Sequence, residues 1–203
     1  MTNIDFDFFK VNLLNDLILS FNNLPIDNYY ENKRYRRFSL IDIFTYKIID
    51  QSIFHQSKKY NTFLGNKKRI YPGIEESTLN NKCFQLLVKN FVRTISNNRK
   101  DTRIYVHQIR VDCENSFVDP IPEGIHQDGF DFICICCINK HNIEPVKNEI
   151  LDLDKKTILI KELDVGECLV LNDRKFYHNV TKLNTFNKKE KGYRDIFVFT
   201  TLK

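Results

Sequence analysis

A short segment of the chain places an imidazole and a carboxylate at a spacing that suits a metal ion. Within residues 122–129, His126 stands two positions before Asp128. If this segment is extended, the two side chains project from the same face. An imidazole nitrogen and a carboxylate oxygen then lie side by side, as two ligands of one ion would. A surface ion pair in a loop is the alternative interpretation.

Two residues further along the chain extend this pattern. His178 follows a turn at residues 172–173, and Arg194 lies near the start of the last predicted strand. Two imidazoles and one carboxylate leave half of an octahedral coordination sphere open, which is typical of non-haem Fe(II) oxygenases. An arginine on the inner face of a strand needs an anionic partner, and its guanidinium can bind a carboxylate with two hydrogen bonds. We therefore expect Arg194 to bind the carboxylate of a co-substrate.

The elements that must position these residues change in character near Asn98. Before it, apolar residues recur every three or four positions over residues 4–22 and 79–95, which predicts two amphipathic helices. Ser77 or Thr78 is the expected N-cap of the second helix. After it the period becomes two, and we expect six strands: 103–112, 130–139, 157–163, 167–171, 176–182 and 193–202. No helix-length segment separates them, which favours antiparallel pairing in a sandwich or barrel.

We therefore expect a mainly β protein with flanking helices, of the α+β class, built as a single domain over residues 1–203. Residues 1–98 would form a helical N-terminal part that packs on a β-barrel core of residues 99–203. A chain of 203 residues is long enough for one compact domain with a sizeable core. The segments 40–49 and 52–56 are apolar but too short to assign.

The ordered set His126-x-Asp128, His178 and Arg194 resembles the Fe(II)/2-oxoglutarate-dependent dioxygenases. More narrowly, it is similar to the bacterial free-amino-acid hydroxylases of the isoleucine dioxygenase type. Similar local stretches span about residues 24–202 and are found at 24–29, 34–37, 122–129, 169–174 and 192–195. The resemblance implies a double-stranded β-helix, the cupin-like jelly roll, preceded by N-terminal helices. Many relatives carry Ser or Thr two positions after the arginine, where this chain has Ile196.

The resemblance also implies a reaction and its cofactors. Fe(II) would be held by His126, Asp128 and His178, with 2-oxoglutarate and O2 as co-substrates. Arg194 would bind the distal carboxylate of 2-oxoglutarate. The implied enzyme is a hydroxylase that releases succinate and CO2, and we expect its substrate to be a small metabolite, a free L-amino acid. The carbon that is oxidised, and the choice between hydroxylation and sulfoxidation, are left open.

A basic stretch near the N-terminus offers a second site for an anion. Arg34, Arg36 and Arg37 are interleaved with an aromatic residue and could bind the carboxylate of the substrate. The alternative is a solvated surface, because basic residues of this kind usually lay their alkyl stems over apolar neighbours and keep their charged heads in water. His107 and His141 are expected to be structural or exposed, because a lone histidine is more often a satisfied polar group than a ligand.

The charge and hydropathy of the chain bear on its partners. A formal net charge of +5 permits contact with nucleic acid, but there is no dense basic stripe, and we expect no nucleic-acid partner. No apolar run is long enough for a membrane span, and the acidic N-terminus does not resemble a signal peptide. We therefore expect a cytoplasmic protein without a membrane partner, and the oligomeric state is left open.

Six cysteines raise the question of a zinc site. The one C-x-x-C spacing, from Cys134 to Cys137, lies in a predicted strand that points these two side chains to opposite faces, which argues against a zinc knuckle. In a strand over residues 132–138, Cys134 and Cys136 point to one face and Cys137 to the other, so these three thiols cannot converge on one ion. We expect the cysteines to act as small buried residues in a reducing compartment.

Two other classes of function remain open. The same oxygenase chemistry could act on a macromolecule, as in nucleic-acid demethylation or protein hydroxylation. The chain could also be a cupin-like metal protein, or a binding module, without oxygenase activity. Arg194 argues against this last class, because a simple metal hydrolase does not need a second group that binds a carboxylate.

Overall fold

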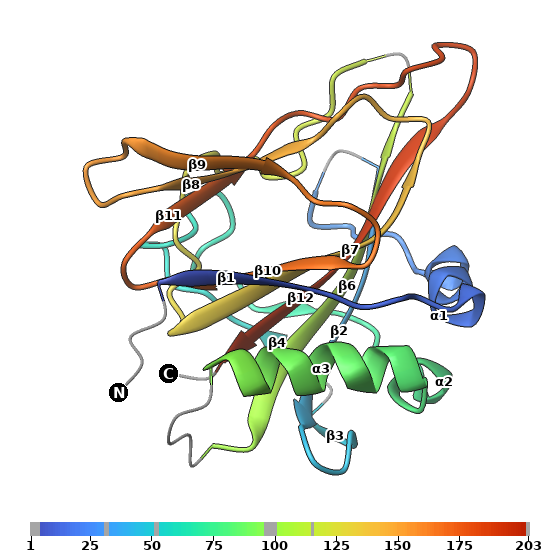
Figure 1. The fold of residues 1–203 in the computed structure, drawn as a ribbon, viewed down its shortest axis with the longest axis vertical. Coiled ribbons are helices and arrows are strands. Elements are labelled where there is room, and N and C mark those ends of the chain that lie inside the picture. Colours follow the sequence, from blue (N-terminus) through green and yellow to red (C-terminus); the bar gives the residue numbers. More distant parts are fainter. Residues whose placement is uncertain (1–4, 31–32, 51–52, 96–100, 115, 202–203) are drawn as a thin grey trace.

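The computed structural model describes residues 5–30, 33–50, 53–95, 101–114 and 116–201, and its architecture is mainly β with a few helices (Figure 1). The strands are β1 (Phe6–Lys10), β2 (Arg34–Asp42), β3 (Ile48–Asp50), β4 (Ile53–Phe54), β5 (Arg69–Ile70), β6 (Arg103–Cys113), β7 (Phe132–His141), β8 (Lys147–Leu151), β9 (Thr157–Glu162), β10 (Glu167–Asn172), β11 (Tyr177–Val180) and β12 (Gly192–Thr201). The helices are α1 (Asn15–Leu19), α2 (Glu76–Leu79) and α3 (Lys82–Ile95), and a 3₁₀ turn, η1, covers Ser20–Asn23. None of the described helices is long and apolar enough to cross a membrane.

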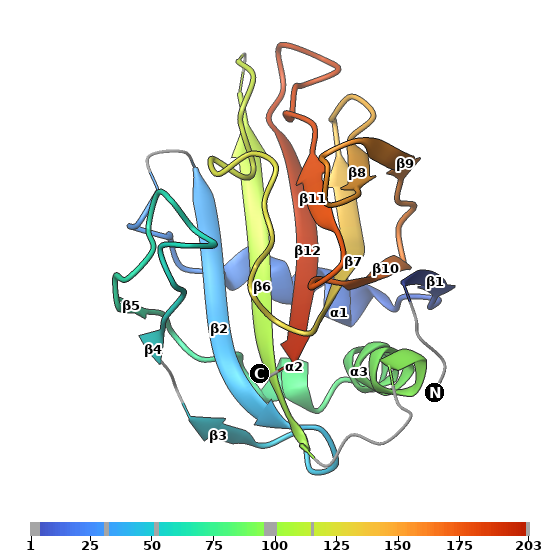
Figure 2. The same cartoon turned by 90° about the vertical axis from the view of Figure 1, so that its left-hand side faces the viewer.

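The strands form two main antiparallel sheets. The larger has the order β1-β10-β7-β12-β6-β2-β3 and the smaller the order β11-β8-β9, while β4 and β5 make a separate pair. Figure 2 shows β11 and β8 in front of the central strands of the large sheet. Because β1 pairs with β10 and β2 pairs with β6, the large sheet joins the N-terminal strands to the C-terminal half of the chain.

The two faces of the large sheet have different neighbours, as β12 illustrates. Ile196 and Val198 pack toward the cluster that includes Val180 of β11. Phe197 and Phe199 pack instead in the cluster that contains the buried face of α3. This alternation follows from strand geometry, in which successive side chains point to opposite faces. Arg194 has the same parity as Ile196 and therefore points toward the small sheet.

The expected helix over residues 4–22 is wrong. Its first part is β1, which pairs with β10, and helical structure is confined to α1 and η1. Phe6 and Phe8 pack in one cluster and Phe9 in another, so this strand is apolar on both faces and has no period-two signal. The expected helical part over residues 1–98 is corrected in the same way, because β1 to β5 all lie in that region.

The second expected helix is confirmed, although it begins differently. It is divided into α2 and α3, and Asn81 rather than Ser77 or Thr78 caps the longer helix. Asn81 Oδ1 accepts hydrogen bonds from the backbone N–H groups of Cys83, at 2.8 Å, and Phe84, at 3.2 Å. This is the usual geometry of an N-cap, which satisfies donors that have no partner within the helix.

The six expected strands are confirmed as β6, β7 and β9 to β12, with ends shifted by a few residues. β2 and β8 were not expected. β2 has a basic and aromatic sequence that is typical of an exposed surface, yet it lies between β6 and β3 in the sheet. β8 has three polar residues in five, so its period-two signal is weak.

All six cysteines are free and buried, as expected from the sequence. Cys134 and Cys136 share the face that packs against α3, while Cys137 belongs to a cluster on the other face. Cys168 of β10 lies directly opposite Cys136, and the sulfur atoms of Cys134, Cys136 and Cys168 lie within 4.8 Å of one another. Cys137 does not converge with Cys134 and Cys136, as expected, whereas Cys168 does, because the strand register brings it near them.

Candidate metal centre and adjoining cavity

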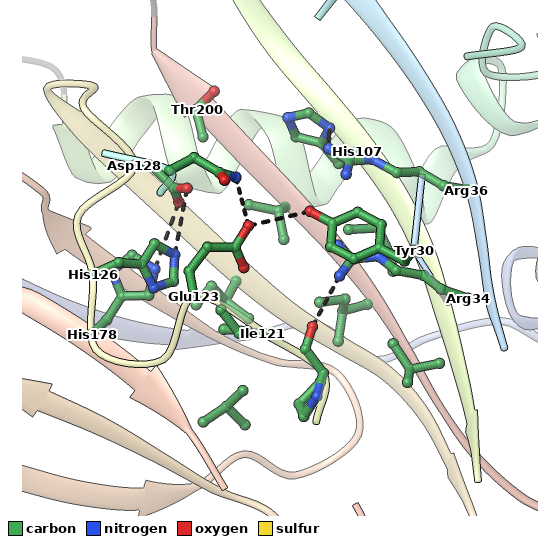
Figure 3. Close-up of a pocket in the computed structure, with 18 of the residues that line it drawn as sticks. Tyr30, Arg34, Arg36, His107, Ile121, Glu123, His126, Asp128, His178 and Thr200 are labelled. Carbon is green, nitrogen blue, oxygen red and sulfur yellow. Dashed lines mark hydrogen bonds and ion pairs between the residues drawn. The ribbon is translucent and has the colours of Figure 1, made fainter. Parts of the chain in front are cut away.

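Three side chains converge where the loop between β6 and β7 meets β11. His126 and His178 form an isolated antiparallel bridge, with His126 N–H donating to His178 O at 3.1 Å and His178 N–H donating to His126 O at 2.9 Å. Asp128 Oδ1 lies 3.6 Å from His126 Nε2, and Asp128 Oδ2 lies 3.6 Å from His178 Nε2. One potential ligand atom from each residue falls within a group less than 4.8 Å across (Figure 3). The predicted set is therefore brought together.

The electrostatics of this set favour a positive charge beside Asp128. Burial opposes a charge on His126, but the hydrogen bond with Asp128 outweighs it and raises the pKa of His126 to about 9. Burial lowers the pKa of His178 to about 3, and repulsion from His126 adds to this effect. The pKa of Asp128 is lowered, despite its burial, by the two imidazoles. A divalent cation placed among the three groups would satisfy the same carboxylate.

Neighbouring groups fix the orientation of the candidate ligands. His126 Nδ1 donates to the carbonyl oxygen of Gly124 at 2.8 Å, because a carbonyl can only accept. This contact directs His126 Nε2 toward Asp128. Gln56 Nε2 donates to both Oδ1 and the backbone oxygen of Asp128, at 3.0 Å in each case. Such outer contacts are usual around metal ligands and set their geometry.

Asp173, in the turn after β10, holds the loop that carries Asp128. Its carboxylate accepts backbone N–H bonds from Asp128 at 3.0 Å, Gly129 at 2.6 Å and Phe130 at 3.0 Å. Asp173 Oδ1 also lies 3.8 Å from His178 Nδ1. Gly129 has a φ of +86°, and a Cβ there would approach the ring of Tyr60 to 2.4 Å. One buried carboxylate therefore links the loop to the second histidine.

Arg194 lies on the cavity face of β12 and is 5% exposed. Its Nη2 donates to Asn148 Oδ1 of β8 at 3.2 Å, and its Nε is buried without a partner. In the part of the chain that the structure describes, no carboxylate lies within 4 Å of it. The adjacent Asp195 points to the other face, where it makes a two-armed ion pair with Arg110 at 2.6 and 2.7 Å. Arg194 is thus a buried cation with room for a carboxylate.

The three arginines of β2 do not point the same way. Arg34 and Arg36 are buried and line the cavity that also contains the two histidines and Asp128. Arg37 points to the opposite face, where it binds Glu75 Oε1 at 2.6 Å and Gly73 O at 3.0 Å. The expected site is therefore corrected: Arg37 is not part of the cavity, because one step along a strand reverses the direction of the side chain.

Several cavity residues were not singled out from the sequence. Glu123 accepts hydrogen bonds from Tyr30 and Asn61, and Arg69 of β5 is 1% exposed. His107, expected to be structural or exposed, is buried and lines the cavity. Glu123 stands three residues before His126, which is the one local signal that could have drawn attention to it. The others are brought in only by long-range contacts.

The chain and its fold are similar to several known proteins. The chain is 29% identical over 201 residues to an L-isoleucine-4-hydroxylase from Bacillus thuringiensis, covering 93% of this chain and 82% of the relative. Among solved structures it is similar to a bsmA homolog from Methylobium petroleophilum PM1, with a TM-score of 0.77, 21% identity and coverage of 93% and 80%. It is also similar to IDO from Bacillus thuringiensis, with a TM-score of 0.74, 21% identity and coverage of 93% and 82%.

These two structural likenesses show a shared fold. The family assignment comes from the sequence, where residues 19–200 match the model of the 2OG-Fe dioxygenases. This match includes the loop between β6 and β7, β11 and most of β12. The chain belongs to the 2OG-Fe dioxygenase family, and it is an enzyme that uses Fe(II) and 2-oxoglutarate.

Proposed function

We propose that this dioxygenase hydroxylates a free L-amino acid. The observation that carries the proposal is a single cavity that joins the His126–Asp128–His178 set to buried arginines. A small anionic or zwitterionic substrate would be held there by charge. The relative named L-isoleucine-4-hydroxylase supports an amino acid as the substrate class. Membership of the family disfavours the alternative of a cupin-like protein without oxygenase activity.

In this proposal His126, Asp128 and His178 hold the iron. Two imidazoles and one carboxylate are a suitable donor set, because they bind one side of the ion and leave the other side open. The contacts of His126 with Gly124 and of Asp128 with Gln56 keep these ligand atoms in place before the ion binds. Bound Fe(II), 2-oxoglutarate and O2 supply the chemistry that hydroxylates an unactivated C–H bond, with succinate and CO2 as co-products.

Arg194 holds the distal carboxylate of 2-oxoglutarate in this proposal. A buried guanidinium with an unpartnered Nε and no carboxylate beside it in the described chain is costly unless an anion binds to it. Ile196 and Val198, on the same face of β12, provide an apolar surface beside the carbon chain of 2-oxoglutarate. Ile196 occupies the position where many relatives have Ser or Thr, so Asn148 is the polar neighbour that orients Arg194.

Arg34 and Arg36, which lie two strands from Arg194 in the same large sheet, give the part of the cavity wall formed by β2 a positive charge that attracts the carboxylate of the substrate. Both share one buried anion, because Asp27 Oδ2 lies 3.7 Å from Arg34 Nε and 4.0 Å from Arg36 Nη1. Two guanidiniums against one carboxylate leave one excess positive charge on this wall. The excess favours a substrate that carries its own carboxylate.

We also propose that the two facing sheets form a double-stranded β-helix and that residues 1–203 make one dioxygenase domain. The small sheet contributes His178 and Asn148, and the large sheet contributes Arg194, Arg34 and Arg36. The site therefore requires both sheets in one unit. A division of the chain near residue 98 would separate β2 from its partner β6.

The test is a panel of the protein L-amino acids, assayed for succinate formation that depends on Fe(II) and 2-oxoglutarate. We expect one or a few amino acids to stimulate succinate formation and to gain one oxygen atom by mass spectrometry. Stimulation by a methylated oligonucleotide or a peptide, with none by any free amino acid, would favour a macromolecular substrate. Full activity of His126→Ala would contradict the assigned iron site.

A further inference from the structure

Among the described residues, the cavity is lined by one carboxylate, that of Glu123, that neither the iron site nor the 2-oxoglutarate site uses. We propose that Glu123 binds the α-ammonium group of the substrate and that Arg69 binds its α-carboxylate, so that the cavity selects a free α-amino acid. This inference rests on the proposed function, since it concerns the substrate of the same site.

Glu123 lies in the cavity as a carboxylate without a cationic partner. Its Oε1 accepts hydrogen bonds from Tyr30 Oη at 3.3 Å and Asn61 Nδ2 at 2.5 Å, both neutral groups. Within the described residues, no Lys, Arg or His nitrogen lies within 4 Å of it. Figure 3 shows this carboxylate between the His126–Asp128–His178 set and Tyr30. An anion held by neutral donors and facing a cavity is a suitable site for an ammonium group.

Glu123 is not a further ligand of the iron. The group of potential ligand atoms that lie within 4.8 Å of one another contains His126, Asp128 and His178, but not Glu123. Hydroxylation of a C–H bond also does not need a carboxylate as general base. The remaining use for a negative charge near the iron is to hold a positive part of the substrate beside it.

Arg69 is the complementary cation. Its side chain is 1% exposed and stacks on the ring of Phe54 at 4.6 Å. Its hydrogen-bonding partners are neutral oxygens, Gln56 Oε1 at 3.4 Å and Tyr30 Oη at 3.5 Å, and its Nε is buried without a partner. Among the described residues no carboxylate pairs with it, whereas Arg34 and Arg36 share Asp27. Arg69 is therefore the cavity arginine, apart from Arg194, that most needs an anion.

Tyr30 sets the distance between these two charges. Its hydroxyl donates to Glu123 and accepts from Arg69, so the carboxylate and the guanidinium are two hydrogen bonds apart. Burial raises the pKa of Tyr30, which keeps this hydroxyl protonated and able to donate. The ammonium and carboxylate groups of an α-amino acid are joined by a single carbon atom. A molecule of that shape can donate to Glu123 and accept from Arg69 at the same time.

This arrangement discriminates by charge. An N-acylated amino acid or a residue within a peptide has no α-ammonium group, so Glu123 would stay without a cation. A 2-hydroxy acid retains the carboxylate for Arg69 but offers Glu123 only a neutral hydroxyl. We expect the free amino acid to bind more tightly than either analogue, because losing a hydrogen bond between charged groups weakens binding by about 10- to 100-fold.

The test measures binding rather than turnover. Anaerobic enzyme loaded with Fe(II) and 2-oxoglutarate is titrated calorimetrically with each protein L-amino acid, and then with the N-acetyl and 2-hydroxy analogues of the tightest binder. Glu123→Gln, which keeps the shape and removes the charge, should weaken binding of the amino acid by about 10- to 100-fold. It should leave the 2-hydroxy analogue nearly unchanged. Glu76→Gln, an exposed change in α2, is the matched control.

The outcomes separate this inference from the proposed function. No binding of any free amino acid, or equal binding by Glu123→Gln and the wild type, would overturn the role of Glu123. Binding of a free amino acid that Glu123→Gln weakens, without succinate formation from it, would instead contradict the proposed hydroxylation and leave the charge recognition standing. Arg69→Lys should weaken the amino acid and the 2-hydroxy analogue alike, since both carry the carboxylate; unchanged binding of both would overturn the role of Arg69.

Discussion

Arg36 of β2 donates a hydrogen bond from Nη2 to His107 Nδ1 of β6, 2.5 Å away. The direction of this bond is fixed, because a guanidinium has donors only, so Nδ1 of His107 is unprotonated. The imidazole also stacks on Phe38, with 4.6 Å between the ring centroids. Burial and the charge of Arg36 lower the pKa of His107 well below its usual range. The pair is thus a buried neutral histidine held against a cation.

This pair predicts a pH-dependent stability. The unfolded chain binds a proton at His107 near pH ~6.5, while the folded chain does not until a much lower pH. The unfolded state therefore binds more protons in this window, and the free energy of unfolding falls as the pH drops below ~6.5. His107→Asn, which retains an acceptor for Arg36, should lack this contribution. Denaturant unfolding at several pH values between ~5 and ~7.5 measures it; parallel curves for the two proteins would contradict the prediction.

Asp128→Asn tests the iron site with almost no change of shape. The substitution removes the negative charge that favours a cation between the two imidazoles, so we expect Fe(II) affinity to fall more than ~100-fold, beyond the effect of losing an outer contact. Succinate formation should be lost with it. Asp131→Asn, in the same loop but paired with the exposed Arg174, is the control and should bind iron normally. Competition with a colorimetric chelator measures the affinity, and equal affinities would remove Asp128 from the site.

Parts of this site could be predicted from the sequence because they depend on local geometry. His126 and Asp128 are two residues apart, so extended backbone places them on one face. Arg194 has the same parity as Ile196 and Val198 of β12, which places it on their face of the strand. At β2 the same alternation separates Arg37 from Arg36, which the sequence grouped in one anion site. Local periodicity does not indicate which face of a strand is buried when both faces carry polar and apolar residues.

Other parts depend on which strands become neighbours. Cys168 meets Cys136 only through the register of β10 and β7, and Arg69 reaches the cavity from a two-residue strand. The spacing of the phenylalanines in β1 also fits a helix because they pack on both faces of the strand, and pairing with the edge of β10 decides the structure. Local propensity is a weak guide where such tertiary contacts determine the element.

Arg194→Gln separates the binding of 2-oxoglutarate from that of iron. Losing a two-armed ionic hydrogen bond to the distal carboxylate should raise the KM for 2-oxoglutarate by ~10- to 100-fold or more, while Fe(II) affinity stays within ~3-fold because no iron ligand changes. Arg103→Gln, which removes an exposed pair with Asp101, should change neither. Steady-state kinetics with varied 2-oxoglutarate and a separate iron titration provide the two readouts. Equal loss of both would show that Arg194 acts through the fold.

Asp173→Asn tests the support of the loop that carries Asp128. The carboxylate accepts three backbone N–H bonds, and the amide that replaces it has one acceptor oxygen fewer, which leaves a buried donor without its partner. We expect a lower melting temperature and Fe(II) affinity reduced by ~10-fold, with an unchanged KM for 2-oxoglutarate. Asp164→Asn, at an exposed ion pair with Lys10, is the control. Unaltered iron affinity would limit Asp173 to a role in stability.

Arg36 and Arg37 are neighbours in β2 that point to opposite faces, so they are a matched pair for testing the part of the cavity wall formed by β2. Arg36 stacks on Tyr71 at 4.5 Å and lines the cavity, whereas Arg37 binds Glu75 on the opposite face. Lysine cannot reproduce a stacked, planar guanidinium, so Arg36→Lys should raise the KM for the amino acid by ~10-fold, while Arg37→Lys should stay within ~2-fold of the wild type. Thermal unfolding of both variants checks that they fold. A similar KM for both would show that Arg36 does not contribute to binding of the substrate.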